Sequence, residues 1–378
     1  MLEFWSLGWI CRRPLSVGHP SINTFALHCE KDSSPRGVTT LSDPVRKAKL
    51  LVEADFVRFE ETLLEALKPQ ADYLTEAEYE TYRRGKKLRP LLMILCARMA
   101  APPGLTDLPA KVIKGSVSLE MLHVATLIHD DIVDVAPVRR GLQTVYSERG
   151  PEMAVLIGDM QFIQAIRCFV EGIDAQKDMD LVRMVLNVGF DLCRGELDEI
   201  LTDPSTGLLE LQHRYFRTIE RKTATLFGLA CESGGLLVDC GKNQALRLGR
   251  FGRRFGTAFQ IMDDIFDIVR PEELAGKTPG IDIEQGRLSL PILYAMEGLT
   301  EDHVLWRILR REPHTPADLA KSINAVADSP GLLRAYSKAR ELALEGMDFL
   351  EEFPESPYRD SLEEIASHIV DRGFDSPD

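Results

Sequence analysis

From residue 43 onward, apolar side chains recur every three or four positions, which predicts a succession of α-helices. We expect ordered structure to begin at Asp43-Pro44, because aspartate is a good N-cap and proline at the first helical position already has a helical φ. In the segment that follows, apolar residues stand at helical offsets at Leu50, Ala54, Val57, Leu64 and Leu67.

Proline- and glycine-containing turns divide the rest of the chain into helical segments. They occur at residues 101–104, 151, 203–207, 271–280, 313–316 and 329–331. No alternating apolar and polar run between hairpin turns is found, so no sheet is expected. The pattern predicts a single all-α domain over residues 43–378, preceded by a loosely ordered extension over residues 1–42.

Composition and charge narrow the possible functions. Hydrophobic residues make up 44% and charged residues 28% of the 378 residues, which suits a globular domain. The net charge of −14 argues against nucleic acid as a partner. No uncharged apolar run approaches the roughly 20 residues needed to cross a bilayer, so no transmembrane segment is expected.

The cysteines point to a reducing compartment. All 7 are scattered and none forms a C-x-x-C pair, which excludes a zinc ribbon and argues against a disulfide framework. We therefore expect a cytoplasmic protein. Arg12 and Arg13, with serines nearby, leave import into an organelle as the alternative.

The strongest chemical signal is the spacing D-D-x-x-D, which occurs twice. Asp130, Asp131 and Asp134 form the first copy, and Asp263, Asp264 and Asp267 form the second. On a helix, positions three and four apart share one face, so each copy crowds three carboxylates together beside apolar neighbours. Repulsion and burial then require a cation or retained protons. Hard oxygen ligands without cysteine favour Mg²⁺, whereas a solvated acidic helix face is the alternative.

Mg²⁺ beside two such clusters suits a diphosphate substrate, which also needs basic residues nearby. Lys86 and Arg89 precede a helix expected to begin near Pro90, and a helix start is itself an anion site. Further candidates are Arg139, Arg140, Lys222, Thr223, Lys277 and Arg287. His123 lies two turns before Asp130 on the same helix face, although a lone histidine there is more often a core residue.

Together these stretches resemble the trans-isoprenyl diphosphate synthases, the polyprenyl synthetase family. The resemblance runs in order from about Gly85 to Pro291. The matching segments are Gly85-Lys86-x-x-Arg89-Pro90, Glu120-x-x-His123, His129-Asp130-Asp131-x-x-Asp134, Arg139-Arg140-Gly141, Ile157-Gly158-Asp159, Gly195-Glu196, Lys222-Thr223-Ala224, Phe259-Gln260-Ile261-x-Asp263-Asp264-x-x-Asp267 and Lys277-x-x-Gly280-x-Asp282-x-x-x-Gly286. It implies a helical bundle of the isoprenoid synthase type with a central cavity, and a homodimer.

The resemblance also implies a role for each group of residues. Isopentenyl diphosphate would be held by Lys86, Arg89, His123 and Arg140. The allylic diphosphate would be held by Arg139, Lys222, Thr223, Gln260 and Lys277. The six aspartates would bind Mg²⁺. Lys87 stands where the family commonly has arginine, and Arg287, also a candidate for substrate binding, stands where it commonly has lysine.

The expected reaction is head-to-tail prenyl transfer. Mg²⁺-assisted ionisation of the allylic diphosphate would leave a cation that attacks the double bond of isopentenyl diphosphate. Product length would depend on Ala125 and Thr126, five and four residues before Asp130. A bulky aromatic residue here stops growth at farnesyl length in the family, and because Ala125 is small we expect a geranylgeranyl or longer product.

Two other functions remain as alternatives. A class I terpene cyclase shares the fold and one D-D-x-x-D, but its second metal motif has serine or threonine where this chain has Asp267, and it has no use for Lys86 and Arg89. A non-catalytic partner subunit of a prenyl synthase is the other, although such subunits tend to lose the aspartates that this chain keeps.

Overall fold

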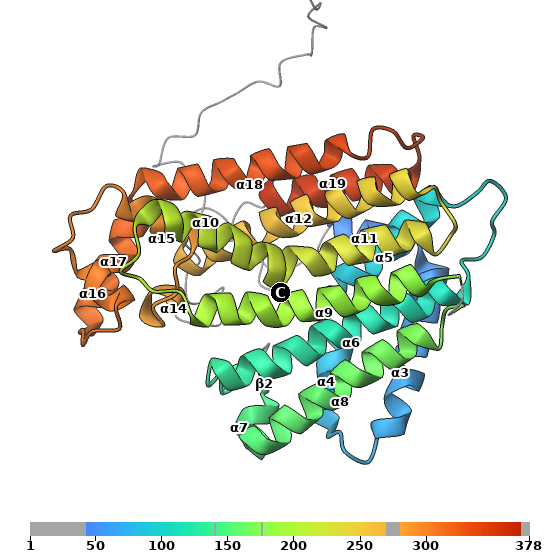
Figure 1. The fold of residues 1–378 in the computed structure, drawn as a ribbon, viewed down its shortest axis with the longest axis horizontal. Coiled ribbons are helices and arrows are strands. Elements are labelled where there is room, and N and C mark those ends of the chain that lie inside the picture. Colours follow the sequence, from blue (N-terminus) through green and yellow to red (C-terminus); the bar gives the residue numbers. More distant parts are fainter. Residues whose placement is uncertain (1–42, 140, 175–176, 270–279, 372–378) are drawn as a thin grey trace, which may run out of the picture. The chain divides into compact units, whose positions relative to one another are not determined.

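The structure, a computed structural model, describes residues 43–139, 141–174, 177–269 and 280–371. Nearly all regular structure in these ranges is helical (Figure 1), which confirms the expected all-α class. The predicted extension over residues 1–42 lies outside the described residues.

The α-helices are α2 (Pro44–Leu51), α3 (Glu53–Leu67), α4 (Glu76–Arg83), α5 (Leu88–Ala100), α6 (Ala110–Val133), α7 (Val145–Arg149), α8 (Pro151–Val170), α9 (Met179–Ile200), α10 (Leu208–Ile219), α11 (Thr225–Leu236), α12 (Lys242–Val269), α14 (Ile281–Glu284), α15 (Leu290–Met296), α16 (Val304–Leu309), α17 (Pro316–Ala327), α18 (Pro330–Asp348) and α19 (Pro357–Asp371). A 3₁₀ turn, η1 (Lys68–Gln70), follows α3, and a π-helical turn, η2 (Glu220–Ala224), joins α10 to α11.

The first helix begins where the sequence predicts. The Asp43 side chain caps α2 by accepting a hydrogen bond from the Val45 amide at 3.0 Å, and Pro44 is the first helical residue. The buried faces of α2 and α3, with the junction between them, consist of Val45, Ala48, Val52, Phe56, Phe59, Leu63 and Leu67. Of the apolar positions noted in the sequence, only Leu67 is buried, and Leu50, Ala54, Val57 and Leu64 are exposed. The chain forms two helices here, and the aromatic residues take the inner face.

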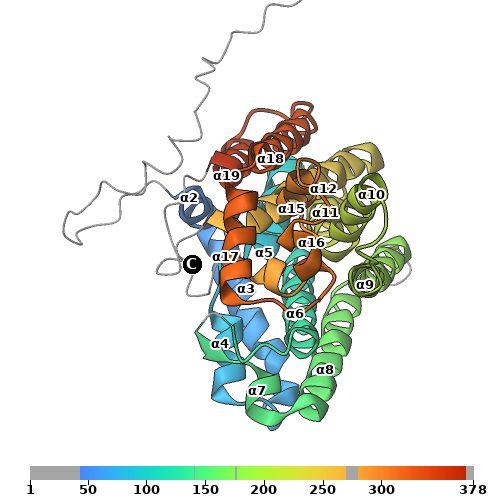
Figure 2. The same cartoon turned by 90° about the vertical axis from the view of Figure 1, so that its left-hand side faces the viewer.

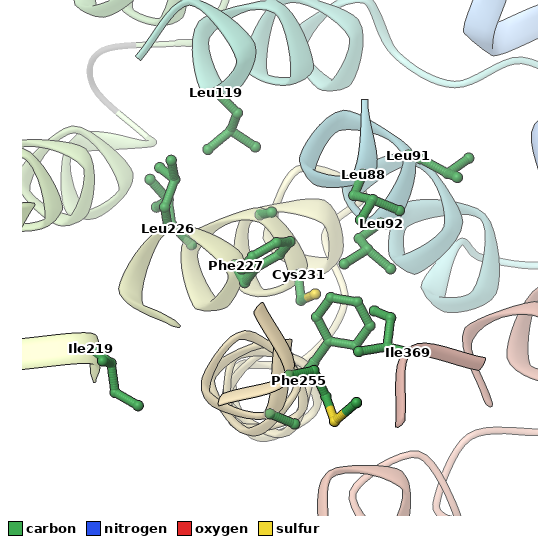
Figure 3. Close-up of a cluster of buried hydrophobic side chains, with 14 of the residues drawn as sticks. Leu88, Leu91, Leu92, Leu119, Ile219, Leu226, Phe227, Cys231, Phe255 and Ile369 are labelled. Atoms are coloured by element: carbon green, nitrogen blue, oxygen red, sulfur yellow. The ribbon is translucent and has the colours of Figure 1, made fainter. Parts of the chain in front are cut away.

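The centre of the bundle is made by α5, α6, α11 and α12. Most residues of α5, α6 and α11 are buried, which explains why these segments are apolar around most of their circumference. Figure 3 shows Phe227 of α11 in one cluster with Leu92 of α5 and Phe255 of α12. The rings of Phe227 and Phe255 meet edge to face with centroids 5.1 Å apart. In the view of Figure 2, α10, α17 and α18 lie around α11 and α12.

Helices α11 and α12 approach closely because the facing surface of α12 carries glycine. A Cβ atom at Gly256 would lie 2.7 Å from the Cα of Ala224, closer than real Cβ atoms come to other atoms. This close approach brings the Lys222-Thr223 segment of η2 beside the half of α12 that carries the second aspartate cluster.

One short hairpin departs from the prediction that no strand forms. Among the described residues, β1 (Val138–Arg139) pairs antiparallel with β2 (Leu142–Gln143). Two-residue strands are too short to leave an alternating pattern. The hairpin turns at Gly141, which has a φ of 74°, and its first strand carries Arg139, which donates a hydrogen bond to Asp131 near the end of α6.

Candidate active site

Three carboxylates lie at the carboxyl end of α6. Asp130 and Asp131 belong to its last turn, and Asp134 is the capping residue. Negative side chains are unfavourable here, because the free carbonyls of a last helical turn already carry partial negative charge. Asp131 is buried and accepts a hydrogen bond from Nε of Arg139 at 2.7 Å, whereas Asp130 and Asp134 line a cavity. The cluster is thus held open toward that cavity at a local cost in stability.

The second cluster, on α12, is anchored through Asp264. Both oxygens of this buried carboxylate accept hydrogen bonds, from the Tyr215 hydroxyl at 2.6 Å and from Nε2 of Gln260 at 2.9 Å. Gln260 is oriented in turn by the Thr223 hydroxyl, which donates to its Oε1 at 2.7 Å. Side chains from α10, η2 and α12 therefore form one chain of hydrogen bonds that ends on Asp264.

The other two carboxylates of α12 differ from Asp264. Asp263 is exposed and lines the cavity. Asp267 is half-buried, also lines the cavity, and accepts a hydrogen bond from the backbone amide of Asp282 at 3.1 Å. That bond ties the start of α14 to the end of α12.

Both clusters face one cavity of about 1900 Å³. Of the six aspartates of the two motifs, five line it: Asp130, Asp134, Asp263, Asp264 and Asp267. The predicted cations and polar residues in its wall are Lys86, Arg89, His123, Arg139, Lys222, Thr223, Gln260 and Arg287. Asp131 is not part of the wall. The fold therefore brings acidic and basic side chains from distant parts of the sequence to one cavity.

Lys222 joins two further carboxylates to the cavity. Its Nζ lies 2.6 Å from Glu196 and 2.8 Å from Glu199, both on α9. The lysine sits in the π-helical turn η2, a local widening of the helix that is frequent at functional sites. Gly195 makes room for it, because a Cβ atom there would lie 2.6 Å from the Lys222 amide nitrogen.

Arg287 connects three elements across the cavity. Its guanidinium pairs with Asp134 at the end of α6, and lies 3.5 Å from Glu199 of α9 and 3.7 Å from Asp282 of α14. Both cations of this part of the wall are thus held by carboxylates.

Burial controls the protonation of the carboxylates. It raises the pKa of Asp130 to about 7 in spite of the nearby Lys222 charge. It also raises the pKa of Asp264 to about 7, although the hydrogen bonds from Tyr215 and Gln260 favour the ionised form. For Lys222, burial alone would lower the pKa, but the charges of Glu199, Asp130 and Glu196 outweigh it and hold the pKa above its ordinary value. A bound cation would therefore offset the cost of burying these carboxylate charges.

The residues expected to hold isopentenyl diphosphate lie in a different part of the wall. Lys86 precedes α5, and Arg89 lies in its first turn, since the helix begins at Leu88 rather than near Pro90. The guanidinium of Arg89 stacks on the Phe227 ring, 4.3 Å from its centroid. His123 on α6 is half-buried and also lines the cavity.

Of the four remaining predicted residues, the structure describes two. Arg140 and Lys277 lie outside the described residues. Thr126 lines the cavity, and its hydroxyl donates to the His123 carbonyl at 2.8 Å. Ala125 is completely buried beside it and does not reach the described cavity wall.

Two residues of the site were not expected from the sequence. Glu199 follows Glu196 by one helical turn, and that spacing was a usable signal, since residues three apart share a helix face. The sequence gives no sign that Tyr215 belongs to the site, because an isolated tyrosine in an amphipathic helix is common. Its contact with Asp264 joins residues that are 49 positions apart.

An exposed apolar face lies outside the cavity, on α8 and α9. These helices approach closely where Gly189 meets the Phe162 ring. Exposed apolar side chains on the two helices include Val155, Leu156, Ile163, Leu186, Phe190 and Leu197, with Phe190 66% exposed. By length and composition, α8 is also the one described helix that could cross a membrane, but this is weak evidence because core helices pass the same test.

The donor set suits a hard divalent cation. Among the residues that the structure describes, no three His, Cys, Asp or Glu side chains already converge on one metal position. Mg²⁺ does not need such a cage, since it is commonly held by one or two carboxylates with water and substrate phosphate completing its shell. Carboxylates of raised pKa around a shared cavity fit that mode of binding.

The described residues form an almost wholly helical fold with carboxylates and cations around one large cavity. A sequence model of the polyprenyl synthetase family matches residues 71–326. The nonaprenyl diphosphate synthase of Mycobacterium tuberculosis is 31% identical over 85% of this chain and 93% of its own length. Heptaprenyl diphosphate synthase component 2 of Geobacillus stearothermophilus is 31% identical over 85% of this chain and 96% of its own.

The fold agrees with these relatives. The crystal structure of the polyprenyl synthase from Caulobacter crescentus, complexed with calcium and isoprenyl diphosphate, superimposes with a TM-score of 0.76. That protein is 28% identical, and the match covers 89% of this chain and 99% of the other. The chain therefore belongs to the polyprenyl synthetase family.

Proposed function

We propose that this protein is a trans-polyprenyl diphosphate synthase, which joins isopentenyl diphosphate head-to-tail to an allylic prenyl diphosphate. The observation that carries the proposal is the cavity that receives carboxylates from both D-D-x-x-D motifs and predicted cations from four other segments, those of Lys86 and Arg89, Arg139, Lys222 and Arg287. Membership of a family of prenyltransferases supports the same activity.

The residues of the cavity have separate tasks in this reaction. Lys222, Arg139, Thr223, Gln260 and Lys277 hold the allylic diphosphate, and Arg287 joins them once it exchanges a carboxylate partner for phosphate oxygens. Holding the two substrates in one orientation converts a bimolecular reaction into an effectively unimolecular one. No side chain is required to form a covalent bond with substrate.

Magnesium is the proposed cofactor. Asp130, Asp134, Asp263 and Asp267 would hold it, while Asp131 and Asp264, whose oxygens accept hydrogen bonds from protein donors, would fix the two helix ends. When bound, Mg²⁺ neutralises the departing diphosphate as a Lewis acid. The Caulobacter structure contains calcium and isoprenyl diphosphate, which supports a divalent cation beside a diphosphate in this family.

Isopentenyl diphosphate is the second substrate. Lys86, Arg89, His123 and Arg140 would hold its diphosphate, with the first turn of α5 adding the positive end of a helix. Arginine and lysine donors outside the carboxylate clusters give this substrate a site that does not depend on metal.

The product is proposed to be a long polyprenyl chain. Relatives named for nonaprenyl and heptaprenyl products support this length, and Ala125 places no bulky side chain near the aspartates. Replacing Ala125 with phenylalanine should shorten the product, read by mass spectrometry, whereas Leu344→Phe on the surface of α18 should not. An unchanged length in the Ala125 variant would show that a larger side chain at this position does not reach the space that the growing prenyl chain occupies.

The exposed apolar face of α8 and α9 supports a homodimer. Large exposed apolar side chains gathered on neighbouring helices suit an interaction site. We further propose that residues 43–378 form one catalytic domain, that residues 1–42 are an extension, and that the protein works in the cytoplasm.

Two alternative functions make different predictions. A cyclase would release a cyclic hydrocarbon or alcohol from one allylic diphosphate, without isopentenyl diphosphate. A partner subunit would be inactive alone, a possibility raised by the relative that is named as one component of a synthase.

Incubation of the purified protein with Mg²⁺, isopentenyl diphosphate and each of three allylic starters tests the proposal. We expect linear prenyl diphosphates that are longer than the starter, and no product when isopentenyl diphosphate is omitted. A cyclic product from the starter alone, or no elongation with any starter, would contradict it.

A further inference from the structure

Lys87, which precedes α5, departs from ordinary backbone preferences. Its φ of 54° and ψ of 42° are left-handed, a conformation that is costly for residues other than glycine, asparagine and aspartate. It is also the N-cap of α5, where a positive charge opposes the helix dipole and no side-chain capping bond is made. Strained residues of this kind persist where the surroundings hold them, and they cluster at functional sites.

The Lys87 side chain is held by Glu120 of α6. Its Nζ lies 2.8 Å from Oε1 of Glu120, and the two side chains are only 5% and 4% exposed. A buried ion pair is weak evidence for stability, because removing both charges from water offsets their attraction. Stability alone therefore gives no reason for this pair at the cavity wall, to which both residues contribute.

The position of the pair suggests its role. Lys87 lies between Lys86 and Arg89 in the chain, and Glu120 lies one helical turn before His123 on α6. Lys86, Arg89 and His123 all line the cavity. One ion pair thus joins the two segments whose side chains surround the proposed isopentenyl diphosphate subsite.

We propose that the Lys87–Glu120 ion pair is the positioning element of this subsite: it holds the left-handed turn before α5 against α6, so that Lys86, Arg89 and His123 converge on one diphosphate. The proposal rests on the proposed function. Neither residue needs to touch the substrate, since the pair acts through its neighbours.

Steady-state kinetics of three variants test the proposal. Lys87→Met, Glu120→Gln and the double variant should each raise KM for isopentenyl diphosphate about tenfold or more, the scale of one charge-assisted hydrogen bond lost. KM for the allylic substrate should stay within about threefold. The double variant should be no worse than either single variant, because both remove the same connection.

A second ion pair on α5 supplies the matched control. Arg98 near the other end of α5 pairs with Asp55 of α3 at 2.6 Å, with side chains 14% and 2% exposed, and neither residue lines the cavity. Asp55→Asn should lower the melting temperature as the Lys87 variants do, but leave KM for isopentenyl diphosphate unchanged. Lys87→Arg, which keeps the charge, should restore part of the lost affinity.

Each other outcome overturns the proposal. Folded Lys87 and Glu120 variants with unchanged KM would show a structural pair only. A raised KM in Lys87→Met but not in Glu120→Gln would show that Lys87 contacts the diphosphate itself. The wild-type protein must elongate an allylic starter in the same assay, so failure of the proposed function is seen separately from failure of this inference.

Discussion

The carboxylates of the cavity differ in what surrounds each of them. Asp131 and Asp264 are buried and accept hydrogen bonds from protein donors, whereas Asp263 is exposed to the cavity and Asp130 is half-buried in its wall. The D-D-x-x-D spacing alone does not distinguish the three aspartates of a cluster from one another. These environments support the proposal that the first aspartate of each cluster binds metal and substrate, while the second also orients the helix end.

The first prediction follows from this difference. Asp130→Asn and Asp263→Asn should each lower kcat by a factor on the order of 100 or more, because each removes a charge that would hold metal and stabilise the departing diphosphate. The helical circular dichroism signal should not change. Asp191→Asn, which loses only a surface ion pair with Arg194, is the control and should retain full activity. Full activity in both cavity variants would contradict the metal-site assignment.

A second prediction concerns pH. Burial raises the pKa of Asp130 and Asp264 to about 7, so the folded metal-free protein holds protons that the unfolded chain releases at lower pH. The free energy of unfolding from these groups is therefore greatest below about pH 4 and is lost as pH rises through about 7. In EDTA, the melting temperature should fall between about pH 5.5 and 7.5, and Asp264→Asn should flatten this slope. A melting temperature that rises over this range would contradict the burial argument.

At the scale of helices, much of the architecture follows from local sequence. Asp43-Pro44 fixes the start of α2, and the apolar segments around both aspartate motifs are the central helices α6 and α12. The all-α class, the family and its prenyltransferase activity, all expected from the sequence, are confirmed by the comparisons.

The local sequence pattern did not predict the contacts between distant segments. The π-helical turn at Lys222, the partners of Arg287 and the Tyr215–Asp264 hydrogen bond depend on how separate helices pack. Periodicity shows which face of a helix is buried but does not show which helix covers it. The exposed position of Leu50, on a helix predicted from its own spacing, has the same cause.

The third prediction tests the close contact between α9 and η2. Gly195→Ala places a Cβ atom 2.6 Å from the Lys222 amide nitrogen, so one of the two segments must shift. We expect a loss of stability of about 1–3 kcal/mol and a higher KM for the allylic substrate. Gly298→Ala, where the nearest atom to a Cβ is the Ala295 carbonyl oxygen at 3.7 Å, should change neither value in thermal denaturation and kinetic assays. Equal behaviour of the two variants would contradict this account of η2.

At the scale of the whole molecule, the packing of a single chain does not explain the exposed apolar side chains of α8 and α9. Apolar side chains cover both helices there, and Leu156 is 63% exposed. Surface of this kind suits a two-fold interface in which each chain presents the same patch.

The fourth prediction is that Phe190→Asp converts a dimer to a monomer in sedimentation equilibrium. The side chain is 66% exposed in the single chain, so the charge should not disturb folding of the monomer. Leu344→Asp, at an exposed position of α18, should leave the dimer intact. A wild-type protein that is monomeric at all concentrations would contradict the proposed interface.

The central claim is that the carboxylates of α6 and α12 together hold one diphosphate through divalent cations. Calorimetric titration of the protein with inorganic diphosphate, with and without Mg²⁺, measures this directly. Binding should be tight only with Mg²⁺, and Asp130→Asn and Asp263→Asn should each abolish it. Equal binding in EDTA, or binding that survives in both variants, would contradict the account.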